Sequence, residues 1–191
     1  MATTDNLLAV GTQIRFCVAG SLSPADDGTN LTIGTPTDVA LTLAGVADTA
    51  GRQSAKVDLG EARAAMYEVL GCVDFTDETP DAVGQIDYYW APSTHATAAN
   101  GNVAGNSGGD ADAPDGALGS ITLAEFLQQC IPIGCLRTHD GACVQNGYVG
   151  KFSPPGRYGQ LVVVNNSGDA FEDDDVEMHQ VLNPIVDQFQ A

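Results

Sequence analysis

Basic residues are scarce in this chain of 191 residues, which has only seven Lys and Arg against 25 Asp and Glu and a formal net charge of −18 at pH 7. A protein that binds nucleic acid through its phosphates needs a positive surface, so the charge argues against this class. The chain also has no apolar run near the roughly 18 residues that span a bilayer. No basic stretch precedes the apolar part of residues 1–10. We therefore expect no nucleic acid partner, no membrane span and no secretory signal.

Cysteine is sparse, and the five cysteines form an odd set without a Cys-x-x-Cys motif. Such usage indicates free thiols in a protein made in a reducing cytoplasm. Four residues of the zinc-binding types lie close together in the sequence, but structural zinc sites usually bring their ligands in tighter pairs. These four are Cys130, Cys135, His139 and Cys143. We therefore predict small buried or free thiols and no zinc site.

Long helical patterns are also missing, whereas short apolar or alternating runs recur between turns rich in Gly, Pro, Asn and Asp. The runs are residues 37–43, 55–60, 67–75, 84–90, 131–137, 142–149, 158–165 and 176–182. This rhythm is typical of an antiparallel sandwich. We predict one all-β domain over residues 1–191, mainly an antiparallel, jelly-roll-like β-sandwich with long irregular loops and at most one or two short helices.

Two segments fall outside this strand pattern. Residues 1–35 are interpreted as an N-terminal arm. Residues 93–119 consist almost wholly of Ala, Asn, Gly, Ser, Thr, Asp and Pro, which cannot repay their ordering entropy by apolar burial. So long a loop is uncommon in a compact domain unless it is functional or orders against a partner. Residues 121–129 fit either a short helix or a strand, and Pro92 predicts the end of the strand before it.

Motifs that could carry chemistry are weak. Residues 105–109 match the Gly-x-Ser-x-Gly pattern of hydrolases, but Ser107 lies in a polar loop without the strand and helix that this nucleophile requires. The acidic residues 110–116 resemble a calcium loop whose third aspartate comes one residue late and whose closing Glu is missing. We therefore predict a non-enzymatic protein with no catalytic residue, no cofactor and no metal site.

Several stretches resemble a known family. They are residues 50–60 (Ala-Gly-Arg-Gln-Ser-Ala-Lys-Val-Asp-Leu-Gly), 62–64, 89–93 (Tyr-Trp-Ala-Pro-Ser), 149–171, 177–179 and 184–187. This pattern, which spans residues 46–190, resembles a family of tailed-bacteriophage virion proteins that are usually labelled structural or hypothetical. The resemblance implies a capsid decoration or cement protein in the virion, made in the host bacterial cytoplasm. Its partners would be the major capsid protein and further copies of itself, with a trimer favoured. A tail component or a receptor- or carbohydrate-binding protein is the alternative.

Partner contacts are predicted from exposed aromatic and charged residues. Residues 88–90 alternate between the two sides of a strand, so one side packs the core and the other could meet a neighbouring subunit. Four carboxylates precede Val176, and they either keep the chain soluble or face a basic surface. The few cations are expected to pair with carboxylates. The predicted partner-binding residues are Tyr89, Trp90, Arg157, Tyr158, Glu172, Asp173, Asp174 and Asp175.

Overall fold

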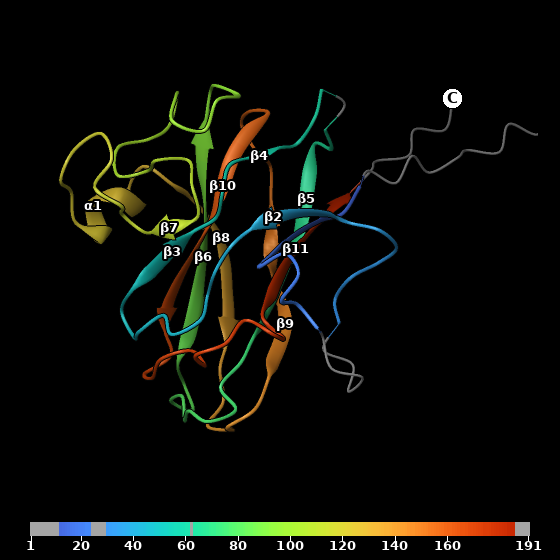
Figure 1. Cartoon of the computed structure of the whole chain (residues 1–191), viewed down its shortest axis with the longest axis vertical. Helices are drawn as coiled ribbons and strands as arrows, with labels where there is room; N and C mark the ends of the chain where they lie inside the picture. Colours follow the sequence, from blue (N-terminus) through green and yellow to red (C-terminus); the bar gives the residue numbers. More distant parts are fainter. Residues whose placement is uncertain (1–11, 24–29, 62, 186–191) are drawn as a thin grey trace, which may run out of the picture.

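The computed structural model describes residues 12–23, 30–61 and 63–185 (Figure 1). The strands are β1 Ile14–Cys17, β2 Thr37–Ala40, β3 Gly51–Gln53, β4 Val57–Asp58, β5 Met66–Val73, β6 Gln85–Ser93, β7 Ala111–Asp112, β8 Ile131–Arg137, β9 Gln145–Phe152, β10 Tyr158–Asn166 and β11 His179–Ile185. One short helix, α1 Leu123–Leu127, begins at a capping box between Thr122 and Glu125. The all-β prediction is confirmed, and residues 121–129 contain the helix. None of the described helices is long and apolar enough to cross a membrane.

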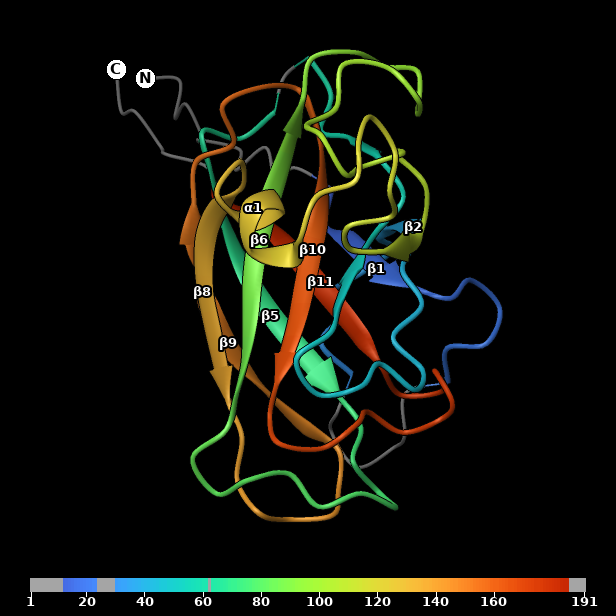
Figure 2. The same ribbon diagram turned by 90° about the vertical axis from the view of Figure 1, so that its left-hand side faces the viewer.

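The strands form one curled sheet with the order β2-β1-β11-β5-β9-β8-β6-β10-β3-β7, and β4 pairs with β10. The ladders are antiparallel except for the parallel pair β1 and β2. In Figure 2 the strands β8, β6 and β10 lie in front of β5 and β11. The two layers of the expected sandwich therefore belong to one sheet. The jelly-roll detail stays a prediction.

The sheet bends between β8 and β9, where Gly134 pairs with Gly150. A Cβ atom on Gly134 would lie 2.1 Å from the carbonyl oxygen of Val149, and one on Gly150 would lie 2.4 Å from that of Ile133. Only glycine fits such close backbone contact. These two glycines therefore let one layer turn into the other.

The main core lies between the two layers. The largest fully buried side chains include Trp90, Tyr88, Phe16, Phe75, Phe171, Leu161 and Leu182. The rings of Trp90 and Phe152 have their centroids 5.2 Å apart, and those of Phe75 and Phe171 are 5.5 Å apart. Each large apolar side chain buried in this way contributes about 1.5–3 kcal/mol. The alternating residues of β5, β6 and β10 thus hold the layers together.

The loop of residues 93–119 packs on its own sheet. Its Ala113 joins Phe126 of α1 and Val162 of β10 in a second apolar cluster outside the main core. The ammonium of Lys56 donates to three backbone carbonyls of this loop, those of His95, Thr97 and Asn100, at 2.7–3.0 Å. Polar contacts within the chain therefore add to the limited apolar burial of this loop and fix it against its own sheet.

The structure differs from the expected strand boundaries at three places. Pro92 does not end β6, which continues to Ser93, because the pairing with β8 already stops at Trp90 and a proline there removes no hydrogen bond on that side. Within the predicted arm, β1 is an internal strand between β2 and β11. Residues 1–11 and 24–29 of that arm lie outside the described residues. The last predicted strand, 176–182, is displaced to His179–Ile185.

Candidate functional site

Two acidic segments, residues 74–83 and 167–178, lie together at one end of the sandwich. They contain ten Asp and Glu and no Lys or Arg. In Figure 1 the first follows β5 and the second connects β10 to β11 at the lower end of the molecule. We call these two segments the acidic end. It holds ten of the 25 acidic residues of the chain.

Hydrogen bonds fix the two segments against each other. The backbone N–H of Asp77 donates to Oε2 of Glu172 at 3.0 Å, and the N–H of Glu172 donates to the carbonyl oxygen of Asp74 at 3.0 Å. The N–H of Thr79 donates to Oδ2 of Asp169 at 3.2 Å. Backbone donors thus hold the carboxylates in place. The negative charge is therefore gathered on a defined surface.

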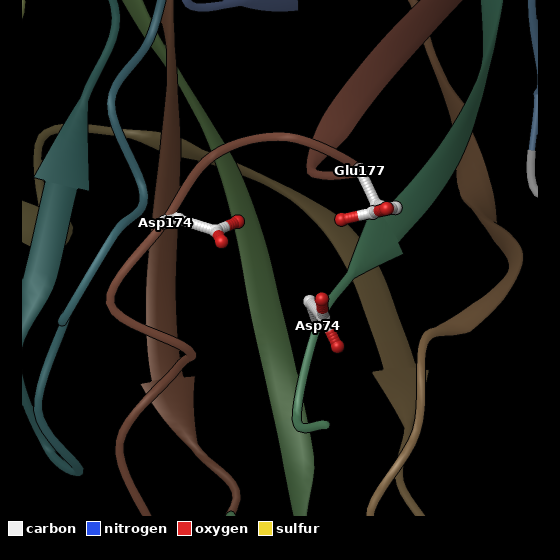
Figure 3. Close-up of side chains that lie close together, drawn as sticks. All are labelled: Asp74, Asp174 and Glu177. Atoms are coloured by element: carbon white, nitrogen blue, oxygen red, sulfur yellow. The ribbon is translucent and has the colours of Figure 1, made fainter. Parts of the chain in front are cut away.

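Asp74, Asp174 and Glu177 bring carboxylate oxygens within 4.8 Å of one another (Figure 3). These are oxygen ligands of the kind that Ca²⁺ takes, but calcium is usually held by six to eight of them. The buried Asp74 already accepts hydrogen bonds from the N–H and the hydroxyl of Thr76, and Asp174 accepts one from the N–H of Val176. Two of the three carboxylates, those of Asp74 and Asp174, are therefore already used by the fold, and we assign no metal to the group.

Like charges act on one another in the acidic end. Neighbouring carboxylates, above all Asp169, raise the pKa of the partly exposed Glu78. Burial raises the pKa of Asp175, although the N–H groups of Leu43 and Ala44 donate to its Oδ1 at 2.7 and 2.9 Å and lower it. Both shifts mean that the negative form is disfavoured. For Asp175 the cause is burial, whereas for Glu78 it is repulsion within the acidic end, which a positive charge placed nearby would relieve.

The predicted charged contacts separate into two groups. Glu172, Asp173, Asp174 and Asp175 lie in the acidic end, whereas Arg157 and Tyr158 lie at the opposite end of β10, about 30 Å away for a strand of this length. The guanidinium of Arg157 donates two hydrogen bonds to Asp58, at 2.6 and 2.7 Å. It also lies over the ring of Tyr158, 5.2 Å from the centroid. The eight predicted residues therefore do not form one surface.

Trp90 was wrongly predicted as a partner contact. Its side chain is fully buried in the main core, where Gly159 lies directly beneath the indole ring. Tyr89 does point to the other side of β6, but it is half-buried because it packs against the second apolar cluster with Phe126 and Val162. Alternation along the strand was predicted correctly. What the sequence did not indicate is that α1 and the 93–119 loop cover the outer side.

The remaining metal candidates are held apart or used elsewhere. Cys130 is buried after α1, where burial raises its pKa to about 12, while Cys143 is exposed between β8 and β9. In the calcium-like loop, Asp110 and Asp112 bind Arg52 at 3.0 and 2.9 Å. Among the described residues, the carboxylates around Asp74 are the one group of three or more potential ligands that lie close together. We therefore assign no metal site to the cysteines of residues 130–143 or to the calcium-like loop of residues 110–116.

Ser107 has local partners. Its N–H donates to Oδ2 of Asp115 at 2.8 Å, and its hydroxyl oxygen accepts from the N–H of Gly109 at 3.2 Å. Asp115 also accepts from the N–H of Ala117. These contacts are those of a folded turn. They give Ser107 a structural role in the loop.

A groove of about 320 Å³ lies at the end of the sandwich opposite the acidic end. Its described lining includes Ile14, Leu59, Arg63, Tyr67 and Pro184. The hydroxyl of Tyr67 accepts a hydrogen bond from the N–H of Ala64 at 3.3 Å. The groove therefore has a mixed lining of apolar residues and of both charges, since Asp58 also borders it.

Sequence reasoning missed six of the ten acidic residues of the acidic end, among them all four of its first segment. The first segment of the acidic end was not proposed as a site, although its acidic residues lie close together in the sequence. These residues are Asp74, Asp77, Glu78 and Asp81. Comparisons with protein-family models, with curated proteins and with solved structures find no match to this chain. The acidic end is thus identified from its own geometry.

Proposed function

We propose that this protein is a non-enzymatic structural component of a tailed-bacteriophage particle that decorates the outer surface of the capsid. It binds the major capsid protein through the acidic end. The observation that carries this proposal is the dense negative charge of the acidic end, whose two segments contain ten Asp and Glu, Asp74 among them buried, and no Lys or Arg. The family resemblance of residues 46–190 supports it independently.

The fold and the charge fit such a role. A decoration protein gains strength from many identical contacts repeated by symmetry, and a rigid sandwich presents the same surface in every copy. A strongly negative protein is repelled by packaged nucleic acid but attracted by basic patches on a shell. We expect it to act as a homo-oligomer, with a trimer favoured.

A receptor- or carbohydrate-binding protein of the tail is the alternative, and it receives less support. Such a protein would present aromatic side chains at loop tips. Among the described large hydrophobic residues that are exposed, Tyr148 is the one aromatic, and it lies in strand β9. Trp90 is buried. We therefore favour decoration of the capsid.

Binding to purified particles tests the proposal. The protein is mixed with capsids that lack it, and the bound fraction is measured by sedimentation at increasing salt. We expect saturable binding in symmetric copies that weakens steeply with salt, because exposed charge pairs are screened over about 10 Å at 0.1 M. Electron microscopy of the complex then locates the protein. Absence of binding to capsids, together with absence of the polypeptide from native particles, would refute the proposal.

A charge-matched pair of variants separates the acidic end from net charge. The test variant carries Glu172→Gln, Asp173→Asn and Asp174→Asn, which keep an acceptor oxygen at each position. The control variant removes three charges elsewhere, by Glu61→Gln, Asp112→Asn and Glu125→Gln. We expect the test variant to lose capsid binding and the control to retain it. Equal loss in both would show that net charge, and not the acidic end, governs binding.

A further inference from the structure

Asn100 precedes Gly101 in an exposed turn of the 93–119 loop. The N–H of Asn100 donates to the carbonyl oxygen of Thr97 at 3.1 Å, and Gly101 has a φ of 69°. The backbone carbonyl oxygen of Asn100 accepts from the ammonium of Lys56 at 2.7 Å and from the hydroxyl of Ser93 at 3.3 Å. One peptide group thus combines an Asn-Gly sequence with a cation on its oxygen.

We propose that Asn100 is a site of spontaneous deamidation, promoted by Lys56. The backbone nitrogen of Gly101 loses its proton to water or hydroxide and attacks Cγ of Asn100. A bond forms between these two atoms, the bond from Cγ to Nδ2 breaks, and Nδ2 leaves as ammonia after taking up a proton. Water then adds to the cyclic imide and opens it. The product is aspartate or isoaspartate at position 100, and no electrons are transferred.

Lys56 acts on the atom where charge develops. Removal of the proton from the nitrogen of Gly101 spreads negative charge over that nitrogen and the carbonyl oxygen of Asn100, because the two belong to one amide. An ammonium 2.7 Å from this oxygen stabilises the charge. Glycine at position 101 adds no Cβ to hinder closure of the ring. The side chain of Asn100 makes no hydrogen bond within the described part of the chain that would hold it away.

The chain contains a matched internal control. Asn146 also precedes a glycine, but both residues lie in β9, where Asn146 faces Cys72 and Gly147 faces Gly71 of β5. Strand pairing fixes this peptide in an extended form, which keeps its nitrogen away from the side chain. Asn106 precedes a serine and is buried, with its Oδ1 accepting from the N–H of Gly108 at 2.7 Å. Both should be far slower than Asn100.

Mass spectrometry of the full chain during incubation at mildly alkaline pH tests the proposal. Trypsin separates Asn100, in peptide 64–137, from Asn146, in peptide 138–151. In the folded protein we expect Asn100 to deamidate about tenfold faster than Asn146, as one charge-assisted hydrogen bond in the rate-limiting step would give. In urea the two rates should converge, because both residues then precede glycine in an unfolded chain. Equal rates in the folded protein would overturn the proposal.

Variants of Lys56 test its part. Lys56→Met should slow Asn100 and leave Asn146 unchanged, while Lys56→Arg, which keeps the positive charge, should stay close to the original rate. If Lys56→Met makes Asn100 faster while Asn146 stays slow, then Lys56 restrains the turn and the promoting role is wrong. If the substitution unfolds the chain, the deamidation rate at Asn146 rises to its value in urea. The proposal is then tested by the rates of Asn100 and Asn146 in the folded, unsubstituted protein.

Discussion

The hydroxyl of Tyr88, on β6, donates a 2.8 Å hydrogen bond to Oε1 of Gln180, on β11, across the interior of the sandwich. Both residues are fully buried, and Nε2 of Gln180 donates to the carbonyl oxygen of Cys72 at 2.8 Å. Burial raises the pKa of Tyr88 far above its ordinary value, so the phenol stays a donor at any accessible pH. This contact links β6 and β11, two strands that lie in opposite layers and are separated by three others in the sheet.

Tyr88→Phe should destabilise the fold by about 1–3 kcal/mol, because it leaves a buried acceptor on Gln180 without a partner. The free energy of unfolding in urea measures the loss. Tyr148→Phe is the control, since Tyr148 is 52% exposed. It should change stability by less than about 0.5 kcal/mol. Similar small effects from both variants would contradict the role assigned to Tyr88.

His179 should make stability fall as the pH is lowered. Its ring is buried, with Nδ1 facing the carbonyl oxygen of Glu177 at 2.7 Å and Nε2 accepting from the N–H of Leu31 at 3.0 Å. Burial lowers the pKa of His179. The unfolded chain therefore binds a proton near pH 6.5 that the folded chain resists, so stability is full above this pH and is lost below it.

The measurement is the free energy of unfolding between about pH 8 and pH 5.5, above the range of most carboxylates. We expect His179→Gln to flatten the slope that the unsubstituted chain shows. The control is His139→Gln, at an exposed histidine. His139→Gln should leave the dependence of the unfolding free energy on pH unchanged. If His179→Gln also leaves it unchanged, a group other than His179 is responsible for it.

Gly159→Ala should be among the most damaging single substitutions. A Cβ atom at this position would lie 2.3 Å from Cε2 of the buried Trp90. The indole and β10 would have to move apart, at a cost of about 3 kcal/mol or more. Gly156→Ala is the matched control, because its Cβ would lie 3.6 Å from the nearest atom. Thermal unfolding of the two variants should differ by many degrees, and a similar midpoint would show that the core yields at Trp90.

Glu78→Gln should raise the melting temperature at low salt. Nearby carboxylates raise the pKa of Glu78, which means that its charged form is disfavoured at neutral pH, and removal of the charge removes that repulsion. In 1 M salt the gain should vanish, because the screening length falls to about 3 Å. Glu61→Gln, outside the acidic end, serves as the comparison. A gain that persists in high salt would point to a cause other than repulsion.

Sequence patterns identified the strands that carry their own apolar signal. β8 agrees with the predicted residues 131–137, and β10 extends the predicted run of 158–165 by one residue. β3 and β7 were missed because their two or three residues have no periodicity of their own. They are held instead by pairing and by the bond from Arg52 to Asp112. Short strands of this kind depend on neighbours that only the folded chain provides.

The candidate site could be predicted only in part, because the sequence does not show which segments the fold brings together. The charges before Val176 stand out in the sequence, but their closeness to Asp74 and Asp77 follows from the chain direction of β5 and β10, which both end at the acidic end. Alternation along β6 places Tyr89 and Trp90 on opposite sides of the strand, but it does not tell which other elements cover each side. The burial of Trp90 was therefore not predicted. Both the closeness of the two acidic segments and the burial of Trp90 follow from the topology of the sheet.

The bend at Gly134 and Gly150 has a mechanical consequence. In a sandwich of two separate sheets, the layers slide past each other when only side-chain contacts yield. Here each strand from β2 to β7 pairs with the next, and β8 pairs with β9 at the bend, so a pull on one layer is passed to the other around the bend. Separating the layers means breaking the hydrogen bonds between paired strands, and a load applied to one face is shared by the strands of both layers.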